Sequence, residues 1–219
     1  MAVHGVLFDL GGVLIDWNPR HLYTKLLPDQ DDRIDYFLAN ICPLEWNEQQ
    51  DAGRSLATAT DERARQFPDW EPEIRAYYSR WKEMIGGEIP GTAVLAGELA
   101  ASGVRLFALS NWSLETFPLV RDRFSFLSLF EKIFLSGEYG MAKPDPRFYR
   151  KAIEQTGLPV DQLLFVDDNP RNVFAAEALG LRSTVFKSAT QLRGALAEMG
   201  LTQGAIVAPT ESNTSTAPS

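Results

Sequence analysis

The stretch from Val3 to Asp9 constrains the fold of this chain most strongly. Val3 to Phe8 is a short, mainly apolar run with no polar alternation. Such a run predicts a strand buried on both faces, as in a parallel sheet covered by helices. The run ends at Asp9, and Gly11 and Gly12 follow closely. An acid at the carboxyl end of a buried strand, beside glycines that let a ligand approach, is where open α/β sheets place their chemistry. Taken alone, Asp9 could equally cap a turn.

Beyond residue 91, helices and strands are expected to alternate. Helices are expected where apolar residues recur at helical spacing, and strands where short apolar runs lie between turn residues. The interior Pro118 predicts a kink or a break in one helix. This alternation predicts a doubly wound, mostly parallel sheet, which is an α/β fold. The expected helices are 92–102, 114–124, 146–156, 170–179 and 189–199, and the expected strands are 104–109, 132–135, 163–166 and 183–186.

Residues 16–88 interrupt this alternation after the first strand. The segment is predicted to contain only helices and no strand, and the glycine- and proline-rich stretch 86–91 is predicted to form a hinge that closes it. We therefore expect an α/β core of residues 1–15 and 89–200 and an inserted helical domain of residues 16–88. Residues 201–219 are rich in Thr, Ser, Ala and Pro, which predicts a disordered tail. The helices expected in the insert are 19–27, 31–40, 43–50, 55–66 and 71–83.

The composition excludes several classes of function. The chain of 219 residues has a net charge of −8, and its 21 Lys and Arg residues are scattered. Nucleic-acid and anionic-membrane partners are therefore not expected. Cys42 is the only cysteine, which excludes an internal disulfide and a cysteine-based metal cluster. Since no basic leader or long apolar stretch is present, we expect a cytoplasmic protein, either a monomer or a homodimer.

Two groups of polar residues lie where predicted strands end or predicted helices begin. Ser110 and Asn111 follow the strand 104–109. A hydroxyl, an amide and free backbone N–H groups at that place can bind an anion. Lys143 precedes Pro144 in the loop before the helix 146–156, where its charge could pair with both a carboxylate and a phosphate. A helix cap and a solvated lysine are the simpler interpretations of these residues.

Asp167 and Asp168 form a third group, directly after the predicted strand 163–166. If this strand lies beside the first one, both carboxylates converge with that of Asp9. Three carboxylates at close range repel one another, and a divalent cation relieves the repulsion. Hard oxygen ligands select Mg²⁺ rather than zinc or copper. A helix cap would explain one of the two adjacent acids but not both.

In order and spacing, the segments 8–13, 109–111, 143–144 and 166–172 together resemble the four motifs of the haloacid dehalogenase superfamily. The insert is similar to the helical cap of the subgroup that carries its cap after the first motif. Among its branches, the chain looks closest to the sugar-phosphate (glucose-1-phosphate type) phosphatases. The resemblance implies a hydrolase: a Mg²⁺-dependent phosphatase that cleaves a small phosphorylated metabolite, such as a sugar phosphate, through an aspartyl-phosphate.

The resemblance also implies a role for each matched residue. Asp9 would be the nucleophile, and Lys143 would bridge the nucleophile and the phosphate. Gly12, Ser110, Asn111 and Lys143 would bind the phosphoryl group. Mg²⁺ would be held by Asp9, the carbonyl group of Gly11, Asp168 and Asp167, with Asp167 bound directly or through water and Asn172 supporting it. The candidates for contact between the cap and the substrate are Trp17, Arg20, His21 and residues 51–54.

Gly11 departs from the pattern of the resembled phosphatases. Most of them have a second aspartate two residues after the nucleophile, which acts as general acid and base. The loss of such a group typically slows the reaction about 10²–10⁴-fold. We therefore expect slow turnover or another proton donor, such as Asp16 or a cap residue. Two alternatives remain open: a metal-independent 2-haloacid dehalogenase, and a phosphate-binding protein with weak or vestigial catalysis.

Overall fold

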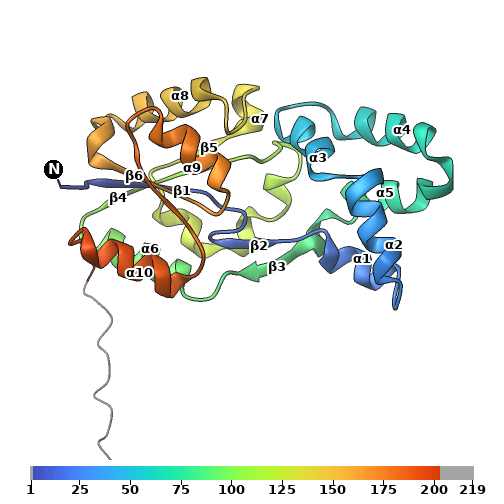
Figure 1. Cartoon of the computed structure of the whole chain (residues 1–219), viewed down its shortest axis with the longest axis horizontal. Coiled ribbons are helices and arrows are strands. Elements are labelled where there is room, and N and C mark those ends of the chain that lie inside the picture. Colours follow the sequence, from blue (N-terminus) through green and yellow to red (C-terminus); the bar gives the residue numbers. More distant parts are fainter. Residues whose placement is uncertain (1, 203–219) are drawn as a thin grey trace, which may run out of the picture.

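The computed structural model describes residues 2–202, so most of the predicted tail, residues 203–219, lies outside the described residues. Its centre is a sheet of five parallel strands in the order β5-β4-β1-β6-β7 (Figure 1). The central strand β1 pairs with β4 on one side and β6 on the other, which confirms the predicted α/β fold. The strands are β1 (Gly5–Phe8), β4 (Arg105–Ser110), β5 (Lys132–Leu135), β6 (Leu163–Asp167) and β7 (Arg182–Val185).

Helices cover both faces of this sheet. α8 (Pro146–Thr156) and α9 (Pro170–Glu177) pack on the face that carries Leu7 and Phe165. α6 (Thr92–Ala101) and α10 (Ala189–Glu198) pack on the opposite face. Because successive residues of a strand point to opposite faces, the uniformly apolar strands fill two cores at once.

The helical insert lies beyond the carboxyl ends of the strands (Figure 1). It is built around buried aromatic side chains, among them Tyr23, Phe37 and Tyr77. These rings supply the apolar area that lets a segment of about seventy residues hold its own core. Its helices are α1 (Arg20–Leu26), α2 (Asp31–Tyr36), α3 (Leu44–Asp51), α4 (Leu56–Gln66) and α5 (Glu71–Ser79), with a π-helical turn at Phe37–Ile41 and 3₁₀ turns at Pro68–Trp70 and Trp81–Met84.

The expectation that residues 16–88 contain no strand is wrong. β2 (Ile15–Trp17) and β3 (Ile85–Glu88) form an antiparallel ribbon through which the chain enters and leaves the insert. Gly86 and Gly87, two glycines of the predicted hinge, belong to this ribbon, whereas Gly91 precedes α6. A Cβ atom at Gly86 would overlap the carboxylate of Asp16, so the close approach requires glycine there.

The helix expected over residues 114–124 is also absent. The structure has 3₁₀ turns at Phe117–Leu119, Arg121–Arg123 and Ser125–Leu129 instead. Pro118 cannot donate a backbone hydrogen bond, and its ring hinders the preceding helical turn. Two short elements were not expected: α7 (Ser136–Tyr139) and a 3₁₀ turn at Val160–Gln162. Within residues 2–202, no helix is both long enough and apolar enough to span a bilayer.

Candidate active site

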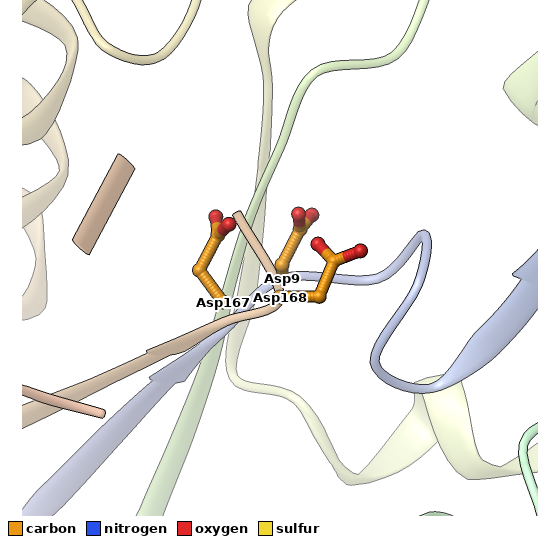
Figure 2. Close-up of side chains that lie close together, drawn as sticks. All are labelled: Asp9, Asp167 and Asp168. Carbon is orange, nitrogen blue, oxygen red and sulfur yellow. The ribbon is translucent and has the colours of Figure 1, made fainter. Parts of the chain in front are cut away.

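Three carboxylates meet at the carboxyl ends of β1 and β6 (Figure 2). Phe8 pairs with Val166 in the parallel register, so the next residues, Asp9 directly after β1 and Asp167 at the end of β6, lie side by side. One carboxylate oxygen each of Asp9, Asp167 and Asp168 lies within 4.8 Å of the other two. The condition for this convergence, that the two strands are neighbours, is therefore met. Asn169, not either aspartate, caps α9, which leaves both carboxylates available for the site.

Lys143 is buried against this acidic group. Its Nζ lies 2.8 Å from Oδ2 of Asp9 and donates a hydrogen bond of 2.7 Å to Oδ2 of Asp167. Asn111 fixes the backbone of Lys143, since its Oδ1 accepts from the lysine N–H at 2.8 Å and its Nδ2 donates to the lysine carbonyl at 2.9 Å. The side-chain amide of Asn111, which was predicted to bind the phosphoryl group, therefore positions the backbone at Lys143.

The carboxylates carry more negative charge than Lys143 alone can balance. Burial raises the pKa of Asp9 to about 7, Lys143 opposes this shift, and the nearby Asp167 adds to it. Partial loss of hydration and the charge of Asp167 also raise the pKa of Asp168. A group of three oxygen-donor side chains with such a charge excess fits a hard divalent cation.

Asp167 differs from the other two acids because protein donors surround its carboxylate. Asn172 donates to both oxygens, at 3.0 and 3.1 Å, and the N–H of Asn169 donates to Oδ1 at 2.9 Å. With the bond from Lys143, these contacts use the lone pairs of a buried carboxylate. Asp9 and Asp168 are therefore the better placed direct ligands, and Asp167 fits contact through water.

A cavity of about 270 Å³ opens above the carboxylates and lies between the sheet and the insert. Seven of the eight predicted site residues line this cavity, and only Asp167 does not. The predicted residues in the wall are Asp9, Gly11, Gly12, Ser110, Asn111, Lys143 and Asp168.

The two glycines after Asp9 are not equivalent. Gly12 has a φ of 74°, and a Cβ atom there would overlap the carboxylate of Asp168, so this position requires glycine. Its N–H donates to the carbonyl of Ile15 at 3.0 Å, so the donor expected to hold a phosphoryl group is engaged within its own loop. At Gly11, by contrast, no atom lies within 4 Å of an added Cβ.

The insert contributes several cavity residues that the sequence did not indicate. Leu44, Asn47 and Glu48 of α3, together with Trp81, line the cavity, as do Trp112 and Asn169 from the core. Their only sequence signal was proximity to residues already singled out, such as Asp51 and Asn111. Side chains on one helix face come from positions three and four apart, and only the docking of α3 shows which face meets the sheet.

Only some of the candidates for substrate contact line the cavity. Trp17 and Asp51 line the cavity. Arg20 and His21 do not line it. Arg20 forms a salt bridge with Asp35 at 2.5 Å, and the ring of His21, in α1, lies 2.9 Å from Asp16 of the ribbon.

Asp51 joins the insert to the core. Its Oδ1 accepts from the N–H of Ser113 at 3.2 Å, and its Oδ2 accepts from Asn47 at 2.7 Å. Ser136 donates to the Asp51 carbonyl at 2.5 Å. Burial, the largest influence, raises the pKa of the Asp51 carboxyl well above its usual value. The insert is thus fastened to the core at the edge of the cavity.

The family model of the haloacid dehalogenase-like hydrolases matches residues 3–180, which include β1, β4, β5 and β6 of the sheet and all four groups of site residues. The chain belongs to this family. A sesquiterpene phosphatase of Aspergillus oryzae is 30% identical over 176 residues, which cover 80% of this chain and 85% of that protein. As a member of this family of hydrolases with phosphatase relatives, the protein is an enzyme.

Two further similarities extend this result. A drimenol cyclase of Aspergillus calidoustus is 38% identical over 109 residues, which cover 47% of this chain but only 21% of the cyclase. The chain therefore spans about a fifth of that relative. An enzyme of the same family from Bacteroides thetaiotaomicron, solved with magnesium and inorganic phosphate, superposes with a TM-score of 0.63 at 25% identity. The match covers 85% of this chain and 96% of that structure.

Proposed function

We propose that this protein is a Mg²⁺-dependent phosphatase that acts on a small phosphorylated metabolite. The observation that carries the proposal is the convergence of Asp9, Asp168 and Lys143 at the carboxyl ends of neighbouring strands. The similar enzyme solved with magnesium and phosphate and the sesquiterpene phosphatase support it. The sugar phosphates implied by the sequence resemblance are one candidate class of substrate.

Asp9 is the proposed nucleophile. Its carboxylate would attack phosphorus in line with the departing oxygen and form an aspartyl-phosphate, which water then hydrolyses. Leu10 donates its N–H to Oδ1 of Asp9 at 2.7 Å, and Lys143 contacts Oδ2, so the side chain is held in one orientation. Such positioning lowers the entropic cost of the attack.

Asp9 and Asp168 would hold Mg²⁺ with the carbonyl group of Gly11, and Asp167 would act through water. When bound, the cation would neutralise charge on the nucleophile and the phosphoryl group. Lys143, Ser110 and the backbone at Asn111 would bind the phosphoryl oxygens.

Glu48 is the proposed proton donor in place of a side chain at position 11. It lines the cavity, and within residues 2–202 it forms no salt bridge and no side-chain hydrogen bond. Partial burial raises the pKa of this carboxyl, while the charge of Arg171 opposes the shift. A carboxyl with a raised pKa can deliver a proton to a leaving oxygen near neutral pH.

We also propose that residues 16–88 form a cap domain and that residues 1–15 and 89–200 form the catalytic core. The contacts of Asp51 with Ser113 and Ser136 support a closed arrangement over the cavity. A closed cap would exclude water from the phosphoryl group.

Phosphate release from p-nitrophenyl phosphate, measured with Mg²⁺ and with EDTA, tests the proposal. We expect release that depends on Mg²⁺ and on Asp9, so Asp9→Asn is inactive. Asp122→Asn, at an exposed aspartate outside the cavity, serves as the matched control and retains activity.

Two outcomes would replace the proposed function. Metal-independent release of chloride from 2-chloropropionate, lost in Asp9→Asn, would establish a dehalogenase. Tight binding of inorganic phosphate by a protein that turns over no phosphate ester would indicate a binding protein with vestigial catalysis.

A further inference from the structure

The cavity wall that faces the phosphoryl site is made largely of carbon. Trp17, Leu44 and Trp81 approach it from the insert, and Trp112 approaches it from the core. The indole nitrogens of all three tryptophans are buried away from solvent, so their ring carbons form the cavity surface. Trp17 and Trp81 lie against each other, with ring centroids 5.6 Å apart. Leu44 is 50% exposed at the rim, which extends this apolar surface outward.

The polar side chains of the same wall are mostly engaged with one another. Asn47 donates to Asp51 at 2.7 Å, and its Oδ1 accepts from the hydroxyl of Tyr78 at 2.9 Å. The second carboxylate oxygen of Asp51 accepts from the N–H of Ser113. Apart from Glu48, the insert side chains in the wall present no free polar group to the cavity, since the unpaired indole N–H groups of Trp17 and Trp81 are buried. A polyhydroxylated leaving group would find few partners here, and its unpaired hydroxyls would be costly to bury.

The charges of the cavity wall also disfavour a negatively charged leaving group. Among the cavity-lining residues, all within the described chain, Lys143 is the one cation, and Asp9 and Asp167 already contact it. Arg171 acts electrostatically on Glu48 but does not line the cavity. A carboxylate or second phosphate on the leaving group would therefore be buried in this cavity without a free cation to compensate its charge.

Gly11 leaves room beside the reacting atoms. Because no atom lies within 4 Å of the position of its absent Cβ, the cavity continues up to the side of Asp9. A carbon skeleton attached directly to the ester oxygen can occupy that space.

We infer that the preferred substrates are phosphate monoesters of uncharged, predominantly hydrocarbon alcohols. The inference rests on the proposed phosphatase function and names the leaving group of that reaction. The carbon skeleton packs against Trp17, Trp81 and Leu44, while the phosphoryl group occupies the site above the aspartates. The expected substrate class is therefore apolar phosphate esters rather than sugar phosphates.

The test compares straight-chain alkyl phosphates from ethyl to octyl with glucose 1-phosphate, each with Mg²⁺. Burial of one CH₂ group is worth up to about fourfold in affinity. We expect kcat/KM to rise by about tenfold or more from ethyl to hexyl phosphate and to exceed that for glucose 1-phosphate. The dissociation constants of the matching alkylphosphonates, measured by calorimetry, should fall in parallel, which separates binding from turnover.

Leu44→Lys tests the wall itself. Since Leu44 is half exposed, its replacement does not disturb the core. We expect it to lower kcat/KM for hexyl phosphate by a larger factor than kcat/KM for ethyl phosphate. Leu119→Lys, at a leucine that is 44% exposed and outside the cavity, is the matched control and should behave like the wild type.

Different results would contradict the apolar substrate class and the phosphatase function. If p-nitrophenyl phosphate is hydrolysed but chain length has no influence, or glucose 1-phosphate is preferred, the apolar class is wrong and the phosphatase function stands. If no phosphate ester is hydrolysed and no phosphonate binds, the function is wrong, and the inference about the leaving group falls with it.

Discussion

Without metal, the ionisation of Asp9 should oppose folding, and Asp9→Asn should remove this effect. The pKa of Asp9 is about 7 in the folded protein, against an ordinary value of 3.8. The folded state therefore binds more protons than the unfolded state between these values, and stability falls as the pH rises through this window. From about pH 5 to about pH 8, Asp9 alone should lower the free energy of unfolding by about 2.5 kcal/mol.

Urea denaturation in EDTA, at several pH values across this range, measures the effect. The other acids with raised pKa values, Glu48, Asp51 and Asp168, lower stability in the same direction. They are present in both proteins, so the difference between the wild type and Asp9→Asn reports the ionisation of Asp9 together with its electrostatic effect on neighbours such as Asp51. The wild type should lose about 2.5 kcal/mol more than the variant, or about 5–10 °C in Tm.

Saturating Mg²⁺ should flatten the pH dependence of the wild type, since a cation that binds the ionised carboxylates stabilises the folded state. It should have a smaller effect on Asp9→Asn, which lacks one proposed ligand. Equal losses of stability in the two proteins in EDTA would refute the proposed electrostatic strain at Asp9.

Three other substitutions test neighbouring parts of the site. Lys143→Met leaves buried carboxylates without their counter-charge and should cost about 3–5 kcal/mol in urea denaturation. Gly12→Ala should destabilise by more than about 1 kcal/mol and weaken Mg²⁺ binding measured by calorimetry, because of its positive φ and the overlap with Asp168. Glu48→Gln should lower kcat about 10²-fold on alkyl phosphates but little on p-nitrophenyl phosphate, whose leaving group needs no proton. Gly11→Asp, whose Cβ would lie more than 4 Å from any atom outside residues 10–12, should restore kcat in that variant.

Each of these expectations has a result that contradicts it. Unchanged stability of Lys143→Met would show that the lysine does not compensate the acids. Wild-type Mg²⁺ affinity in Gly12→Ala would show that the loop tolerates a side chain beside Asp168. If Glu48→Gln lowered kcat equally on alkyl phosphates and on p-nitrophenyl phosphate, Glu48 would not be the proton donor and would act in binding.

The sequence by itself determined the core fold and the acidic centre. Uniformly apolar runs have no exposed face, so strands such as Leu163–Asp167 had to lie inside a sheet covered on both sides. An acid at the end of each of two such strands is brought to the same edge whenever the strands are parallel neighbours. Asp9, Asp167 and Asp168 were therefore identifiable before their distances were known, and Pro146 with Gly157 marked both ends of α8.

Only the tertiary structure decided how these groups are used and what faces them. Local patterns gave Gly86 and Gly87 as a hinge, whereas pairing with β2, distant in sequence, makes them a strand. Local patterns likewise do not reveal the hydrogen bonds that engage Asn111, Gly12 and Asp167, because these depend on the folded arrangement of the chain. The cavity wall depends on how the insert docks, because Leu44, Glu48 and Trp81 are ordinary helix or turn residues until that contact sets their direction. Periodicity records which face of an element is buried, but not which distant element buries it.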